Sequence, residues 1–320
     1  MIRPRAFPTK QSDIDWLPSL ENYQKRVANR LKQGSLEKEL PNGFPSSVQY
    51  AICWTALDIS SSGYVYDFSS ADIDDIDHAL QSFRGKVFVG RYGLGTRLDQ
   101  VSQVVHNGRG VTVLRDLGLS KYDLYENIIF PHQDVGDIVD PERKRQSPSS
   151  NSVQPFYTDL GDVIAMHEDD GEYYSHPILC HDAKTDRVSF CFSRRQLTGS
   201  SLSPHPPWLP PMTEAQAEVL DAIHFTAAKH ALSIQLQRGD VAFMNNLGIF
   251  HVREAFKDNE DSGHHIIRLW LRNEKLAWKT PDNMEGVWGH IYGGIYPQVW
   301  YMSPNHGLAH VISKKAACFG

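Results

Sequence analysis

The sequence predicts an α+β protein whose strands form a curled sheet or barrel. Helical patterns fill the N-terminal third of the chain, and strand-like segments dominate from residue 153 onwards. A single helix interrupts that series of strands. This order is typical of α+β architecture, because strands that follow one another along the chain pair mainly with each other.

Three helices are expected before the strands begin. Asp13 or Asp15 is a suitable N-cap for the first, because a short acidic side chain accepts hydrogen bonds from the first free amides of a helix. The second begins near Ser69, where apolar residues start to recur at helical spacing. The third covers residues 96–106, and Gly108 supplies a stop signal.

The later elements are shorter. A buried strand is expected at residues 111–114, and the polar, turn-rich segment 140–152 is expected to be a loop. Thr213 and Gln216 have the spacing of a capping box, which predicts the helix inserted among the strands. The other strand-like segments are 153–166, 176–180, 188–194, 232–237, 241–244 and 265–271.

Composition excludes several classes of partner. The 320 residues carry a formal net charge of -6, so we expect no nucleic-acid partner. Four cysteines without CxxC spacing argue against a structural zinc site and fit a reducing compartment. The chain shows no apolar leader and no apolar run long enough for a membrane span. A cytoplasmic enzyme with a small-molecule substrate and no membrane partner is therefore expected, with its oligomeric state open.

Two stretches carry the residue types of a chemical site. Gly239-Asp240 forms a turn before a short strand, a second turn leads to His251, and a further strand carries Arg268. Earlier in the chain, Tyr157 and Asp159 lie two residues apart in a predicted strand. Alternate residues of a strand point the same way, so these two side chains are expected on one face.

With the segments 108–117 and 193–200, these stretches resemble the taurine-dioxygenase-like (TauD/TfdA) family of iron(II)/2-oxoglutarate oxygenases, particularly its fungal natural-product branch. The resemblance runs from about residue 65 to 280. It implies a double-stranded β-helix (jelly-roll or cupin-like) core with flanking helices. The expected organisation is a single domain over residues 1–320, with an N-terminal arm and helix at 1–64, the core at 65–280 and a C-terminal extension at 281–320.

The resemblance also implies a metal site and a cosubstrate site. Such enzymes hold iron with two histidines and one carboxylate, and an arginine grips 2-oxoglutarate through a bidentate pair. By resemblance, the metal ligands are Asp159 and His251, and Arg268 and His264 stand at the 2-oxoglutarate positions. Tyr157 occupies the position of the first histidine.

Two of these positions depart from the family pattern. A phenol must lose its proton to bind iron, and phenolate favours the ferric ion over the ferrous ion that activates oxygen. His264 stands where an arginine is usual, and it lacks the fork geometry of a guanidinium. Both implied cofactors, Fe(II) and 2-oxoglutarate, are thus affected together. The 153–166 strand also leads into the next hairpin more directly than the resemblance implies, as if a lid or substrate-binding segment were missing.

An intact H-x-D motif lies elsewhere. His132 and Asp134 could bind iron together with His251, although such a motif also arises by chance in a chain with 15 histidines and 38 acidic residues. Another histidine, His224, is expected on the surface of the inserted helix.

Three functions remain open on the sequence. The first is a secondary-metabolite oxygenase with an atypical iron shell that includes Tyr157. The second is a redox-neutral isomerase, lyase or cyclase that uses Tyr157, Asp159 and His251 as acid–base groups on a substrate with a carboxylate or carbonyl. The third is a pseudoenzyme that supports a partner protein.

Overall fold

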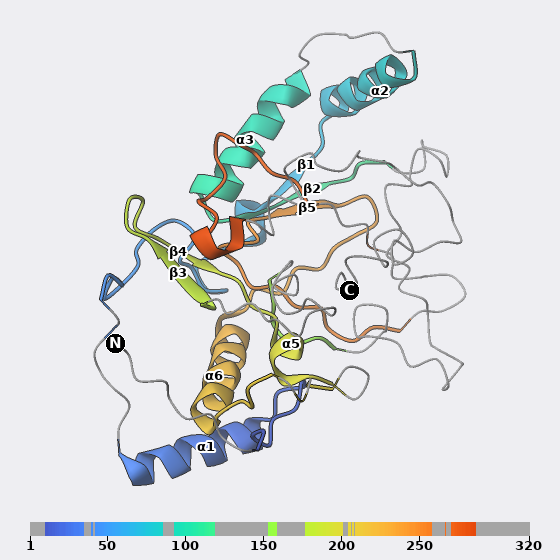
Figure 1. Cartoon of the computed structure of the whole chain (residues 1–320). Coiled ribbons are helices and arrows are strands. Elements are labelled where there is room, and N and C mark those ends of the chain that lie inside the picture. Colours follow the sequence, from blue (N-terminus) through green and yellow to red (C-terminus); the bar gives the residue numbers. More distant parts are fainter. Residues whose placement is uncertain are drawn as a thin grey trace.

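The computed structural model describes residues 10–34, 40, 42–85, 93–118, 153–158, 177–200, 204–205, 207, 209–257, 266 and 270–285. Within these ranges the chain is a mixture of helices and short strands (Figure 1). The helices are α1 (Leu20–Gln33), α2 (Ser70–Gly85), α3 (Gly93–Asn107), α5 (Arg194–Thr198) and α6 (Glu214–His230), with 3-10 turns at Ser61–Gly63 and Asp282–Met284. The strands are β1 (Val65–Asp67), β2 (Val111–Arg115), β3 (Leu179–Asp182), β4 (Arg187–Phe190) and β5 (Val241–Met244).

Helix α1 begins later than predicted. Its N-cap is Ser19, whose hydroxyl accepts the amide hydrogen of Asn22 over 3.3 Å. The predicted caps Asp13 and Asp15 are therefore wrong. These two residues instead offer their backbone carbonyls to arginine side chains, Asp13 to Arg26 and Asp15 to Arg194.

The other helix predictions are confirmed. Ser69 and Asp72 exchange hydrogen bonds at the start of α2, with the Ser69 amide 2.8 Å from the Asp72 carboxylate. Thr213 and Gln216 form the predicted capping box of α6. Each reciprocal pair satisfies two amides that the first turn of a helix leaves without a partner.

A three-stranded sheet has β2 at its centre, parallel to β1 and antiparallel to β5. Helix α3 covers it, with Val101 and Val105 packed against Leu114 (Figure 1). The turn before β5 is fixed by Gly239, which has a φ of +90°, and by Asp240. Burial alone raises the pKa of the Asp240 carboxyl, but hydrogen bonds from Arg115 and the Gln237 amide outweigh it and hold that pKa below its usual range.

The remaining strand predictions are met in part. β3 and β4 form an antiparallel hairpin close to the segments predicted at 176–180 and 188–194. The strand predicted at 232–237 is wrong, because this stretch pairs with no other strand in the part of the chain that the structure describes. One of its carbonyls, that of Gln235, accepts a hydrogen bond from the Arg115 side chain instead.

In the described residues the α+β content is thus present as a three-stranded sheet covered by α3 and a two-stranded hairpin. The double-stranded β-helix and the single-domain boundaries stay predictions, since the described strands do not form a jelly roll. Among the described helices, none combines the length and the apolar character that crossing a membrane requires.

A buried ion cluster joins three helices on the side of the molecule opposite α3 (Figure 1). The Asp221 carboxylate of α6 receives Arg26 of α1 at 2.9 Å and Arg194 of α5 at 2.7 Å. The side chains of Asp221 and Arg194 are only 1% and 2% exposed. Burial lowers the pKa of the Arg194 guanidinium, against the opposing effect of Asp221. A carboxylate shared by two guanidiniums holds α1, α5 and α6 in one arrangement.

Asp221→Asn is expected to lower the free energy of unfolding by about 3–5 kcal/mol, because it removes the carboxylate that pairs with the buried Arg194 and leaves Arg26 to pair with the exposed Glu214. Urea denaturation measures this loss. The matched control is Lys25→Gln, which breaks the exposed pair between Lys25 and Glu21 on α1 and should leave stability nearly unchanged. Equal effects of the two substitutions would show that the cluster does not hold the helices together.

Candidate functional site

The segment 153–158 runs between two other parts of the chain. On one edge, the Tyr157 amide donates to the His251 carbonyl and the His251 amide donates to the Tyr157 carbonyl, each over 3.0 Å. On the other edge Tyr157 forms an antiparallel bridge with Ser193, and the Thr158 amide donates to Phe192 over 2.8 Å. The segment is therefore the middle of three antiparallel chain segments.

The reciprocal pairing fixes the directions of two side chains. In an antiparallel pair that exchanges both hydrogen bonds, the side chains lie opposite each other on one face. The Tyr157 and His251 rings accordingly lie in contact, with centroids 4.4 Å apart and planes inclined by 57°. Thr158 points the other way and is 1% exposed, with its hydroxyl accepting the Phe192 amide hydrogen over 2.9 Å.

A turn after β5 delivers His251 to this position. The Asn245 carbonyl accepts the amides of Gly248 and Ile249 over 3.0 Å each. A Cβ atom on Gly248 would come within 2.8 Å of the Trp278 ring, so only glycine fits the turn against that side chain. The sequence pattern that follows Gly239-Asp240 predicted both this turn and the histidine at its end, His251.

Helix α6 contributes a histidine that the sequence prediction placed on the surface. His224 is half-buried, with its ring centroid 5.4 Å from that of Phe156. Its Nδ1 lies 3.5 Å from the Phe156 amide nitrogen, which donates to it. Burial and then the charge of Arg194 lower the pKa of His224, while Asp221 opposes them. The surface prediction is wrong because the apolar stripe of α6 extends to this residue.

Most of the other predicted site residues lie outside the described residues: Asp159, His264, Arg268, His132 and Asp134. The structure therefore brings together Tyr157 and His251 and leaves the other proposed ligands as predictions. Within the described ranges, no group of three or more His, Cys, Asp or Glu side chains is placed to hold a metal ion.

The described pair offers one imidazole and one phenol on the same face. Imidazole is an ordinary ligand of non-haem iron, and a phenol binds iron once it has lost its proton. These two donors fit an iron site with an altered set of ligands. They also fit proton transfer to and from a substrate, since both groups gain and lose protons.

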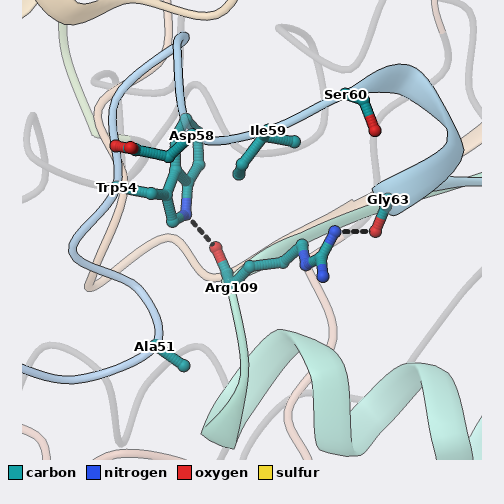
Figure 2. Close-up of a pocket in the computed structure, with 7 residues that line it drawn as sticks. All are labelled: Ala51, Trp54, Asp58, Ile59, Ser60, Gly63 and Arg109. Atoms are coloured by element: carbon teal, nitrogen blue, oxygen red, sulfur yellow. Dashed lines mark hydrogen bonds between the residues drawn. The ribbon is translucent and has the colours of Figure 1, made fainter.

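A pocket of about 280 Å³ lies elsewhere, next to the start of β2 (Figure 2). The Trp54 indole donates to the Arg109 carbonyl over 2.7 Å, and the Arg109 guanidinium donates to the Gly63 carbonyl. None of the predicted site residues lines this pocket. It is therefore separate from the Tyr157–His251 face.

Two comparisons with known proteins bear on the chain. Residues 135–270 match the model of the family described as taurine catabolism dioxygenase TauD, TfdA family. The taurine hydroxylase-like protein SAT17 of the fungus Stachybotrys chartarum is 25% identical over 301 aligned residues, which cover 69% of this chain and 78% of that protein.

Stability should fall as the pH drops below about 6.5, the unperturbed value for histidine. Burial lowers the pKa of both His106 and His224 in the fold, so the unfolded chain binds more protons between that value and the folded one. For each histidine, the free energy of unfolding falls by at most about 1.4 kcal/mol per pH unit. Urea denaturation between about pH 7.5 and pH 5 checks this, above the range in which most carboxyl groups titrate. The double variant His106→Gln/His224→Asn should flatten the dependence, and an unchanged slope would contradict the assignment.

Proposed function

We propose that the chain is a member of the TauD-like family, which it resembles over residues 135–270, and that it is a small-molecule biosynthetic oxygenase whose iron shell contains Tyr157 in place of a histidine. The observation that carries the proposal is the reciprocal pairing of Tyr157 with His251. This pairing sets the Tyr157 phenol directly beside His251, and by resemblance these two residues stand at the positions of the first and the distal histidine of the family's iron site.

Strand geometry supports a third donor on the same face. Thr158 points away from His251 and is buried. If the extended backbone continues by one residue, Asp159 points the same way as Tyr157. Tyr157, Asp159 and His251 would then converge, with one carboxylate, one imidazole and one phenol. Arg268 and His264 are proposed to bind the far carboxylate of 2-oxoglutarate or a carboxylate on the substrate.

Iron at this site would supply oxygen activation, and the residues around it decide how well it is held. His251 would offer an imidazole nitrogen and Asp159 a carboxylate oxygen. Tyr157 either stays a phenol and donates a hydrogen bond, or ionises and becomes a strong ligand that favours ferric iron. The contact between the Tyr157 and His251 rings leaves Tyr157 close to any group that His251 binds.

Redox-neutral catalysis is the second candidate, and the same contact favours it. A phenol beside an imidazole can pass a proton to a bound carbonyl while the imidazole takes one from a neighbouring carbon. Isomerisation, dehydration or cyclisation would need no change of oxidation state. The oxygenase stands first because the family comparisons point to iron and oxygen chemistry.

Replacing Tyr157 tests the proposed ligand position. Tyr157→His should bind ferrous iron at least about tenfold more tightly than the wild type, a gain of about 1.4 kcal/mol, because it restores a second imidazole. Anaerobic titration against a coloured chelator measures the affinity. On oxidation, the wild type should show a visible phenolate-to-iron absorption band, which Tyr157→His and the matched variant Tyr157→Phe both lack.

Two results would contradict the proposal. If His132→Ala abolishes iron binding while Tyr157→Phe leaves it unchanged, the metal site lies at His132 and Asp134. If turnover of a substrate persists in the presence of EDTA without oxygen uptake, the reaction is redox-neutral.

A further inference from the structure

We propose that His224 is a positioning residue for the candidate site: its Nδ1 accepts the Phe156 amide hydrogen and so fixes the backbone that presents Tyr157 to His251. The hydrogen bond does not depend on the proposed function. Only its importance for chemistry rests on that function.

The need for His224 follows from the pattern of backbone hydrogen bonds. Tyr157 and Ser193 form a bridge, so the residues on either side of them should exchange hydrogen bonds across the strands. On one side, the Thr158 amide donates to the Phe192 carbonyl, and the Phe192 amide donates back to the Thr158 hydroxyl. On the other side, the partner of the Phe156 amide should be the carbonyl of Arg194.

That carbonyl belongs to a helix. Arg194 is the first residue of α5, and its carbonyl accepts the hydroxyl hydrogen of Thr198 over 3.2 Å. The ladder of backbone hydrogen bonds therefore ends before it reaches Phe156, a buried residue that is 7% exposed. A buried amide needs an acceptor. His224, reaching across from α6, lies 3.5 Å away and supplies one.

The charges around His224 keep its imidazole able to accept. Arg194 of α5 faces it, and Asp221 lies one turn earlier on α6 and is shared with Arg26 of α1. Two guanidiniums against one buried carboxylate disfavour a further positive charge at this point. The apolar rings of Phe156 and Phe225 complete the surroundings. A neutral imidazole keeps its lone pair for the Phe156 amide, and a protonated one loses it.

Amide hydrogen exchange of Phe156, corrected for the intrinsic rate, tests the proposal directly. In the wild type, protection at about pH 7.5 should exceed, by at least about tenfold, the protection at a second pH below the lowered pKa of His224, where the imidazole carries a proton. His224→Asn should keep the protection at both pH values. The Oδ1 of asparagine occupies the same place in the side chain as the Nδ1 of histidine, so it can accept the Phe156 amide hydrogen, and it does not titrate. His224→Leu should show low protection throughout. The matched control His230→Asn, at the exposed end of α6, should behave like the wild type.

Two outcomes would overturn the proposal: unchanged Phe156 protection in His224→Leu, or the same fall with pH in His224→Asn as in the wild type. If His224→Leu proves too unstable to study, the comparison of the wild type with His224→Asn still decides. Ferrous iron titration of these variants separates the two proposals. If Phe156 loses its protection in His224→Leu but no iron binds at Tyr157, the proposed function is wrong and the role proposed for His224 is retained.

Discussion

The reciprocal backbone hydrogen bonds between Tyr157 and His251 are the constraint on which the candidate site depends. They join two segments that lie far apart in the sequence, and they fix the faces on which both side chains lie. On its other edge the same segment pairs with Ser193 and Phe192. Attachment on both edges leaves the Tyr157 side chain little freedom to exchange faces, because a shift of one residue in register would turn it away from His251.

The buried ion cluster holds together the helices next to this arrangement. Arg194 begins α5 immediately after the bridge at Ser193, and its guanidinium is held by Asp221 of α6. The helix that anchors Arg194 also carries His224, which contacts Phe156. The ion pairs and the candidate site are therefore connected in two ways. Arg194 follows Ser193 along the backbone, and α6 carries both Asp221 and His224.

Local signals in the sequence predicted local structure well. The capping box at Thr213 and the stop signal at Gly108 depend only on neighbouring residues, and the structure bears them out. The strand expected at 232–237 failed because alternation of apolar residues shows which face is buried but supplies no pairing partner. The Ser19 cap was missed because several residues that can cap a helix precede α1, and their residue types alone do not decide among them.

The candidate site was predictable to a similar extent. Tyr157 and His251 were found by resemblance, and their proximity depends on a pairing that no local pattern encodes. The apolar stripe of α6 could have indicated that His224 is partly buried, but its contact with Phe156 arises where a ladder of hydrogen bonds ends at α5, which the sequence of α6 does not encode. Asp159 and Arg268 stay predictions, since both lie outside the described residues.

A phenol beside the distal histidine changes what the site is expected to do. An imidazole at position 157 would favour ferrous iron, whereas a phenolate favours ferric iron and a neutral phenol serves as a proton donor. Tyr157 and His251 are proposed to face one metal ion. Anomalous scattering at the iron absorption edge, from crystals grown anaerobically with ferrous iron, tests this proposal. A single peak is expected at bonding distance from a His251 ring nitrogen and adjacent to the Tyr157 hydroxyl. A peak at His132 and Asp134 without contact to Tyr157, or no peak beside His251 at saturating iron, would contradict it.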